Sequence, residues 1–125
     1  MSQGRGSAVL LVVVAAAMVV VFHSEVAEAA TYTVGGYGGW TFNLANWPKG
    51  KSFRAGDTLV FNYNSLSHNV VPVNGVAYNS CTPQGSVQVY QTGKDRIKLV
   101  KGQNFFICTF PGHCQSGMKI AVTAV

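Results

Sequence analysis

Residues 106–120 read Phe-Ile-Cys-Thr-Phe-Pro-Gly-His-Cys-Gln-Ser-Gly-Met-Lys-Ile, and they bring three candidate metal ligands into one short segment. Cys108, His113 and Met118 follow one another with four residues between each pair. An apolar run that predicts a strand comes before Cys108, Pro111-Gly112 predicts a turn, and a second strand signal follows Met118. The segment is therefore expected to form a loop between two strands that can fold around an ion.

A fourth candidate ligand, His68, lies far upstream, where one strand signal ends and another begins. A sheet can bring it beside the loop, which completes a set of one thiolate, two imidazoles and one thioether. This set suits copper in a trigonal site with Met118 as a weak axial ligand, because it serves both oxidation states of the metal. We therefore predict one type 1 copper ion, Cu(I)/Cu(II), held by His68, Cys108, His113 and Met118.

From residue 31 onward, short runs of Val, Ile, Phe and Thr are separated by Gly, Pro, Asn and Asp, which is typical of strands and turns. Helical periodicity is nearly absent, apart from one short helical turn expected in residues 75–80. The fold is predicted to be all-β, a sandwich or barrel of about seven strands. The expected strands are Thr31–Val34, Thr58–Tyr63, Asn69–Val73, Ser86–Tyr90, Arg96–Val100, Asn104–Cys108 and Lys119–Thr123. Six aromatic residues are expected in the core or in the wall of the site: Trp40, Phe42, Trp47, Phe53, Phe61 and Phe105.

Residues 1–29 have the features of a secretory signal peptide. Arg5 gives a basic start, residues 9–22 form an apolar run, and Ala27-Glu28-Ala29 offers small residues for a cut after Ala29. A membrane anchor is the less favoured alternative, because a spanning helix needs roughly 20 apolar residues. We expect residues 30–125 to form one domain, a monomer secreted into the extracellular space or cell wall without a membrane anchor.

Three cysteines, Cys81, Cys108 and Cys114, leave one thiol unpaired in any single-disulfide arrangement. Metal binding by Cys108 accounts for the unpaired thiol. Because His113 and Cys114 are neighbours, an imidazole that points at the ion turns Cys114 away from it, which favours a Cys81–Cys114 disulfide. On the chain-entropy model this bridge stabilises the fold by roughly 3.5 to 4 kcal/mol. The rival interpretation is a zinc site built from the three cysteines and one histidine.

Without residues 1–29, the chain carries 9 − 1 basic and 4 − 2 acidic residues, a formal charge of +6. This excess suggests attraction to an acidic redox partner or an acidic cell-wall polysaccharide, whereas a secreted chain rarely meets nucleic acid. The residues expected to steer such partners are Lys49, Lys51, Arg54 and the basic residues of 94–101.

The chain resembles the phytocyanins, plant relatives of the cupredoxins, and within them the plantacyanin branch of basic blue proteins and chemocyanins. The motifs that carry the resemblance are Tyr32-Thr33-Val34-Gly35, Gly39-Trp40-Thr41-Phe42, Phe53-Arg54-Ala55-Gly56-Asp57, His68-Asn69-Val70-Val71 and residues 106–120. The resemblance implies a Greek-key β-sandwich of two sheets with one type 1 copper ion at its end, the four ligands named above and the Cys81–Cys114 disulfide. Met118 separates the chain from the similar stellacyanins, which have glutamine at the axial position.

The function expected from these features is outer-sphere transfer of single electrons outside the cell, and not catalysis. We expect electrons to pass through the edge of His113 beside Pro111 and Gly112, and Asn69 to tie the His68 strand to the Cys108 loop by hydrogen bonds. A copper oxidase needs several coppers and many histidines, and residues 30–125 contain two histidines. The alternative that the resemblance leaves open is an extracellular signalling or guidance protein of plant reproduction, in which copper is structural or redox-sensing.

Overall fold

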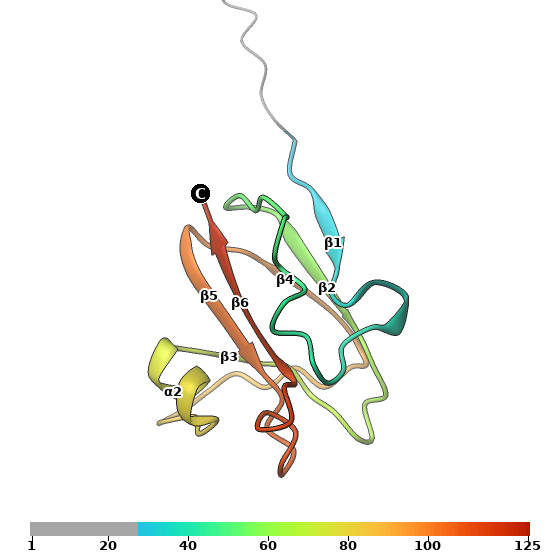
Figure 1. Cartoon of the computed structure of the whole chain (residues 1–125), viewed down its shortest axis with the longest axis vertical. Coiled ribbons are helices and arrows are strands. Elements are labelled where there is room, and N and C mark those ends of the chain that lie inside the picture. Colours follow the sequence, from blue (N-terminus) through green and yellow to red (C-terminus); the bar gives the residue numbers. More distant parts are fainter. Residues whose placement is uncertain (1–27) are drawn as a thin grey trace, which may run out of the picture.

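The structure, a computed structural model, describes residues 28–125, and within them six strands form two sheets (Figure 1). The strands are β1 Thr31–Thr33, β2 Thr58–Asn62, β3 Val71–Val73, β4 Lys94–Lys98, β5 Gly102–Ile107 and β6 Lys119–Ala124. A short 3₁₀ helix, η1, spans Gly36–Gly38, and the helical turn expected in residues 75–80 is present as α2, Gly75–Ser80. Residues 1–27, and with them nearly all of the expected signal peptide, lie outside the described residues.

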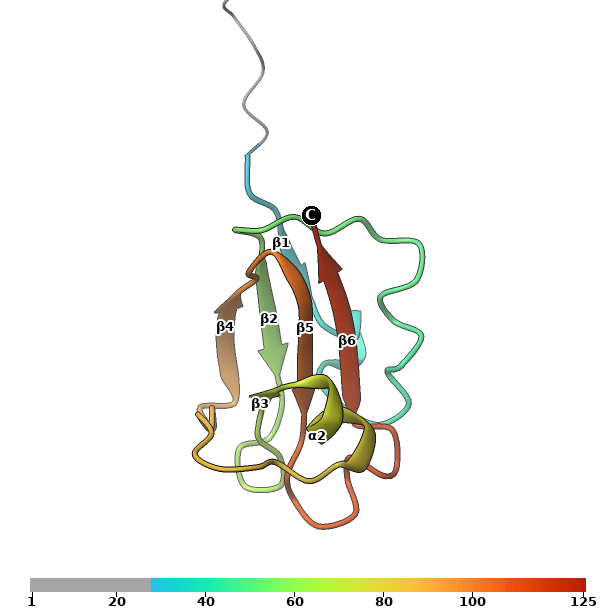
Figure 2. The ribbon, with the colours of Figure 1, turned by 90° about the vertical axis from the view of Figure 1, so that its left-hand side faces the viewer.

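The strand orders are β1-β2-β4 in one sheet and β3-β5-β6 in the other. β1 and β2 pair in parallel, and all other strand pairs are antiparallel. The chain passes from one sheet to the other at each step between β2 and β5. Figure 2 shows β2, β4, β5 and β6 running along the long axis of the domain. The prediction of an all-β fold of two sheets is confirmed.

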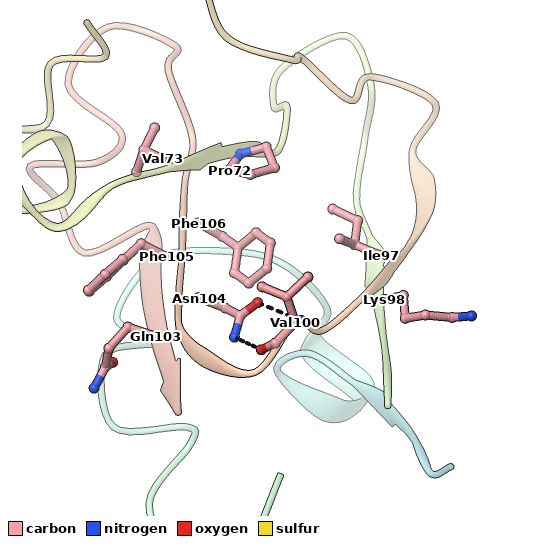
Figure 3. Close-up of a pocket in the computed structure, with 9 residues that line it drawn as sticks. All are labelled: Pro72, Val73, Ile97, Lys98, Val100, Gln103, Asn104, Phe105 and Phe106. Carbon is pink, nitrogen blue, oxygen red and sulfur yellow. Dashed lines mark hydrogen bonds between the residues drawn. The ribbon is translucent and has the colours of Figure 1, made fainter. Parts of the chain in front are cut away.

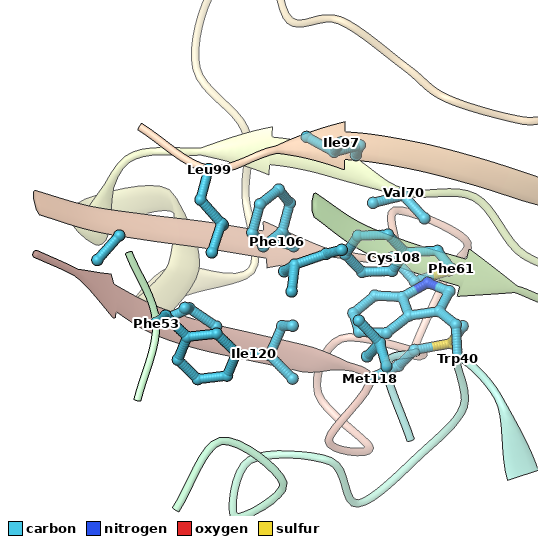
Figure 4. Close-up of a cluster of buried hydrophobic side chains, with 14 residues drawn as sticks. Trp40, Phe53, Phe61, Val70, Ile97, Leu99, Phe106, Cys108, Met118 and Ile120 are labelled. Atoms are coloured by element: carbon cyan, nitrogen blue, oxygen red, sulfur yellow. The ribbon is translucent and has the colours of Figure 1, made fainter. Parts of the chain in front are cut away.

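Alternating side chains build the core between the sheets. In β4 the exposed Lys94, Arg96 and Lys98 alternate with the buried Asp95 and Ile97, as expected for a strand with one face in water. The inward-facing side chains of both sheets form one cluster, which is drawn in Figure 4. This cluster extends to Cys108 and Met118, so the core supports the site directly.

The six aromatic residues expected in the core or the site wall occupy different depths. Trp40, Phe53 and Phe61 are buried, and Trp40 packs edge to face on Phe61 with 5.1 Å between ring centroids. Trp47 packs against the cluster from the outside, and Phe105 lies on Tyr78 of α2. Phe42 is 37% exposed and belongs to the surface around the site.

The strand expected at Ser86–Tyr90 is wrong. Within the described residues this segment makes a single bridge, between Tyr90 and Val70, and the residues before Tyr90 lie outside any ladder. Val87 and Val89 alternate as in a strand, but they are 37% and 49% exposed, so they bury no face against a sheet. β-branched residues favour a strand only where neighbouring strands pack against them.

The free edges of β3 and β4 border an open cavity of about 230 Å³ between the two sheets (Figure 3). Asn104 closes it on one side, because its amide donates to the Val100 carbonyl oxygen and its side-chain oxygen accepts from the Val100 N–H. Pro72 and Lys98 lie on the two edges, where a residue without an N–H and a charged side chain discourage pairing with another strand.

Candidate metal centre

Three of the four predicted ligands meet at one end of the sandwich. His68 lies in the loop between β2 and β3, Cys108 follows β5 directly, and His113 lies in the loop between β5 and β6. One donor atom from each lies within 4.8 Å of the other two. The Nδ1 atoms of His68 and His113 are 3.1 Å apart, and the Sγ atom of Cys108 is 3.6 Å from Nδ1 of His113.

These separations fit a single metal ion. Imidazole nitrogens and thiolate sulfurs lie about 2.0–2.3 Å from a first-row ion such as zinc, so two such ligands stand roughly 3 to 4 Å apart. One thiolate and two imidazoles are also the equatorial donors of a type 1 copper site. The residues present therefore fit the metal that the sequence predicts.

The environment of the donors favours metal binding. Burial lowers the pKa of His68, and the neighbouring His113 lowers it further, which keeps the ring in the neutral form that binds metals. Cys108 is fully buried and is the free cysteine of the described residues. Its thiol thus faces two imidazoles and little water.

Met118 lies directly before β6 and is fully buried. Its N–H donates to the carbonyl oxygen of His113 at 3.0 Å, and its own carbonyl oxygen accepts from the N–H of Cys108 at 3.1 Å. Its side chain lies in the same cluster as Cys108 and Trp40 (Figure 4). The backbone of Met118 is therefore held beside two of the other predicted ligands.

A disulfide joins Cys81 to Cys114, with 5.7 Å between the Cα atoms. Cys81 ends α2, and Cys114 directly follows His113, so the bridge ties the helix to the ligand loop. The rival zinc site is wrong, because two of its three cysteines are used in this bond and offer no thiolate.

Asn69 connects the two ligand-bearing segments. Its side-chain amide donates to Oγ1 of Thr109 at 2.7 Å, and its side-chain oxygen accepts from the N–H of Thr109 at 2.8 Å. Its backbone carbonyl oxygen accepts from Nε1 of the buried Trp40. The two bonds to Thr109 hold Asn69, which follows His68, against Thr109, which follows Cys108. A link between these two segments is what the sequence predicts.

An apolar rim surrounds the imidazole of His113. The Phe42 ring meets His113 edge to face at 5.0 Å between centroids, and Phe110 stacks on it at 5.7 Å. Leu66 is 88% exposed in the loop that leads to His68. Sequence reasoning did not single out Phe110 or Leu66, although Phe110 lies between two predicted site residues, Cys108 and Pro111.

The comparisons with known proteins agree with this geometry. A family model described as a plastocyanin-like domain matches residues 40–118. The chain is 57% identical to a basic blue protein of Arabidopsis thaliana over 100% of both chains, and 55% identical to a chemocyanin of Lilium longiflorum over 99% of both. The solved structure of cucumber basic protein, a blue copper protein, is 62% identical and matches with a TM-score of 0.75 over 76% of this chain and 99% of that one. The chain therefore belongs to the plastocyanin-like family, in its phytocyanin branch beside the basic blue proteins.

Proposed function

We propose that this protein is an extracellular carrier of single electrons that binds one copper ion through His68, Cys108 and His113, with Met118 as a weaker fourth ligand. The observation that carries the proposal is the meeting of one thiol and two imidazoles within 4.8 Å. Thiolate, imidazole and thioether together select copper over magnesium or calcium, which prefer oxygen ligands. Membership of the phytocyanins supports the same metal.

Bound copper would supply a one-electron couple between Cu(I) and Cu(II). The residues around the site determine which molecules can contact the ion. Cys108 and Met118 are fully buried, which keeps water and other thiols away from the sulfur ligands. His113 is half-buried beside the exposed Pro111 and Gly112, so its ring is the group that a redox partner would contact.

The surface around His113 suits brief docking. Residues 41–44, 64–69 and 108–118 contain no lysine, arginine, aspartate or glutamate. The aromatic rings of Phe42 and Phe110 lie against the His113 ring instead. A partner can bind such a surface without removing water from charged groups. This low desolvation cost suits a contact of short lifetime.

Export is part of the proposal, with residues 1–29 as the signal peptide. In the part of the chain that the structure describes, no helix is both long enough and apolar enough to cross a membrane. We propose a carrier and not an enzyme, because both histidines of residues 30–125 belong to the single metal-binding group. A half-buried imidazole at the surface also favours electron transfer over the signalling role that the sequence left open.

The test is the visible spectrum of the purified protein loaded with Cu(II). An intense blue thiolate-to-copper band is expected. Cys108→Ser removes the thiolate and should abolish both the band and reversible one-electron reduction. Ser116→Ala changes an exposed residue of the same loop and should leave both intact. A colourless protein that holds zinc, or a Cys108→Ser variant that still cycles, contradicts the proposal.

A further inference from the structure

The positive charge of the domain lies at its surface without acidic neighbours, because both acidic side chains of residues 30–125 are buried. Asp57 is 2% exposed and accepts from the backbone N–H groups of Ala30 and Arg54. Asp95 is 4% exposed and accepts from the hydroxyls of Tyr63 and Thr92. The surface lysines and arginines of these residues therefore have no exposed Asp or Glu side chain to neutralise them.

Three of these cations form a row on one face. Lys94, Arg96 and Lys98 occupy alternate positions of β4, and all three are exposed. Residues two apart on a strand lie about 6.7 Å from each other, so the row presents evenly spaced positive charges. β4 is the edge strand of its sheet, as Figure 2 shows, and the row borders the outer face of that sheet.

The rest of this outer face consists mainly of small and polar side chains. The strand register places Thr58 opposite Lys98, Val60 opposite Arg96 and Asn62 opposite Lys94. On the far side of β2, the first strand adds the exposed Thr33. A hydroxyl and an amide group therefore lie beside the two ends of the row of cations.

A cavity of about 370 Å³ opens on the same face, lined by Thr33, Gly36, Tyr37 and Asn62. Tyr37 is fully exposed in η1. A tyrosine ring offers a rigid apolar plane with a polar tip, which suits stacking against a sugar ring. Asn62 is both a wall of the cavity and the strand partner of Lys94, so the cavity adjoins the row.

We propose that this surface, which we name the basic face (Lys94, Arg96, Lys98, Thr33, Asn62 and Tyr37), binds an anionic polysaccharide made of uronic acid residues. The repeated carboxylates of such a chain pair with the row of cations. Its hydroxyls bind Thr33 and Asn62, and one sugar ring stacks on Tyr37. An acidic protein or a nucleic acid matches the charges but leaves the hydroxyl-rich surface and the open cavity unexplained.

The inference does not depend on the metal. The basic face lies on the side of the sandwich, on β1, β2, β4 and η1, whereas His68, Cys108 and His113 lie in loops at the end. A polysaccharide on the basic face thus leaves the His113 surface free. The interaction can be measured with or without copper, so its failure is distinguishable from a failure of the copper proposal.

The test is the affinity of the purified protein for a polygalacturonate oligomer, measured by calorimetry. The triple variant Lys94→Gln, Arg96→Gln, Lys98→Gln should weaken binding roughly tenfold, because three exposed charge pairs are lost. Methyl esterification of the oligomer removes its carboxylates and should weaken binding by a similar factor. Circular dichroism of the variant checks that the fold is retained.

A matched control removes the same charge from another side of the domain, where Lys49 and Lys51 lie beside β6 of the other sheet. Lys49→Gln, Lys51→Gln, Arg54→Gln changes the loop that leads to β2, and it should weaken binding less than about twofold, through long-range charge alone. Equal losses in the two triple variants would overturn the proposal, as would equally tight binding of DNA or polyglutamate. Tyr37→Ala leaves the net charge unchanged and should weaken binding about threefold if a sugar stacks there; an unchanged affinity contradicts that contact.

Discussion

Two irregular segments of this domain differ in how firmly they are held. The ligand loop, residues 108–118, buries Cys108, Cys114 and Met118, and its backbone bonds to itself and to Leu44. The connecting segment, residues 82–90, exposes nearly all of its side chains and joins the sheets through one bridge at Tyr90. The connecting segment has the stronger β-strand pattern, yet the ligand loop is the more constrained. Buried anchor side chains, and not strand propensity, determine order in these segments.

The difference has a consequence for metal binding. A site already held in its bound geometry loses less conformational entropy when the ion arrives, so it binds more tightly. The ligand loop has this property, because Met118 bonds to both His113 and Cys108 through its backbone. Changes in the ligand loop should therefore affect the whole domain, whereas equivalent changes in the connecting segment should not.

The largest effect is expected from the bond that joins the two segments. The disulfide runs from Cys81, just before the connecting segment, to Cys114 in the ligand loop. Replacing both by alanine releases a loop in the unfolded chain and should lower the free energy of unfolding by about 3.5 to 4 kcal/mol. Denaturant unfolding measures the loss.

Hydrogen exchange in the same double variant shows which segments become less stable when the disulfide is removed. The amides of Ser116 and Met118, which bond within the ligand loop, should exchange faster than in the unchanged protein. If the loss of stability is below about 1 kcal/mol, or if only residues 82–90 exchange faster, the ligand loop does not need this anchor.

A smaller effect is expected from Asn69. Asn69→Ala leaves the N–H of Thr109 without its partner and should cost about 2 kcal/mol, within the range for an unsatisfied buried donor. Asn64→Ala is the matched control, because the side chain of Asn64 also accepts from a backbone N–H, that of Leu66, but is exposed. Asn64→Ala should lower the free energy of unfolding by less than about 1 kcal/mol. Thermal unfolding of the two variants compares them, and equal losses contradict a special role for Asn69.

The sequence predicted the fold class, and it singled out three residues, His68, Cys108 and His113, that the structure brings together. Cys108, His113 and Met118 are close in the chain, so their chemistry could be recognised from spacing, and His68 from the donor set that it completes. The two-sheet class followed from alternation in segments such as β4 and β6, where buried residues alternate with exposed ones in β4 and with half-buried or exposed ones in β6.

What the sequence did not predict depends on contacts between distant segments. Ser86–Tyr90 alternates as well as β4 does, but only β4 pairs with a neighbouring strand along its length and turns its apolar face into the core. The apolar rim formed by Phe42 and Phe110 around His113 could not be predicted, because the sequence does not show that the loop with Phe42 meets the ligand loop. The basic face likewise arises from strand register, because Lys94 and Asn62 become neighbours only through the pairing of β4 with β2.

The smallest expected effect compares one glycine from each segment. Gly117 in the ligand loop has φ +87° and Gly85 in the connecting segment has φ +70°, so alanine at either position pays the penalty of the left-handed region, about 1 kcal/mol. A Cβ at position 117 would also lie 3.0 Å from the backbone nitrogen of Asn43, whereas at position 85 nothing lies within 4 Å. Gly117→Ala should therefore destabilise the protein by about 1 kcal/mol more than Gly85→Ala, since a close-packed neighbour must move. Denaturant unfolding of both variants measures the difference. Equal decreases in the free energy of unfolding would mean that the ligand loop accommodates the extra methyl group as easily as the connecting segment does.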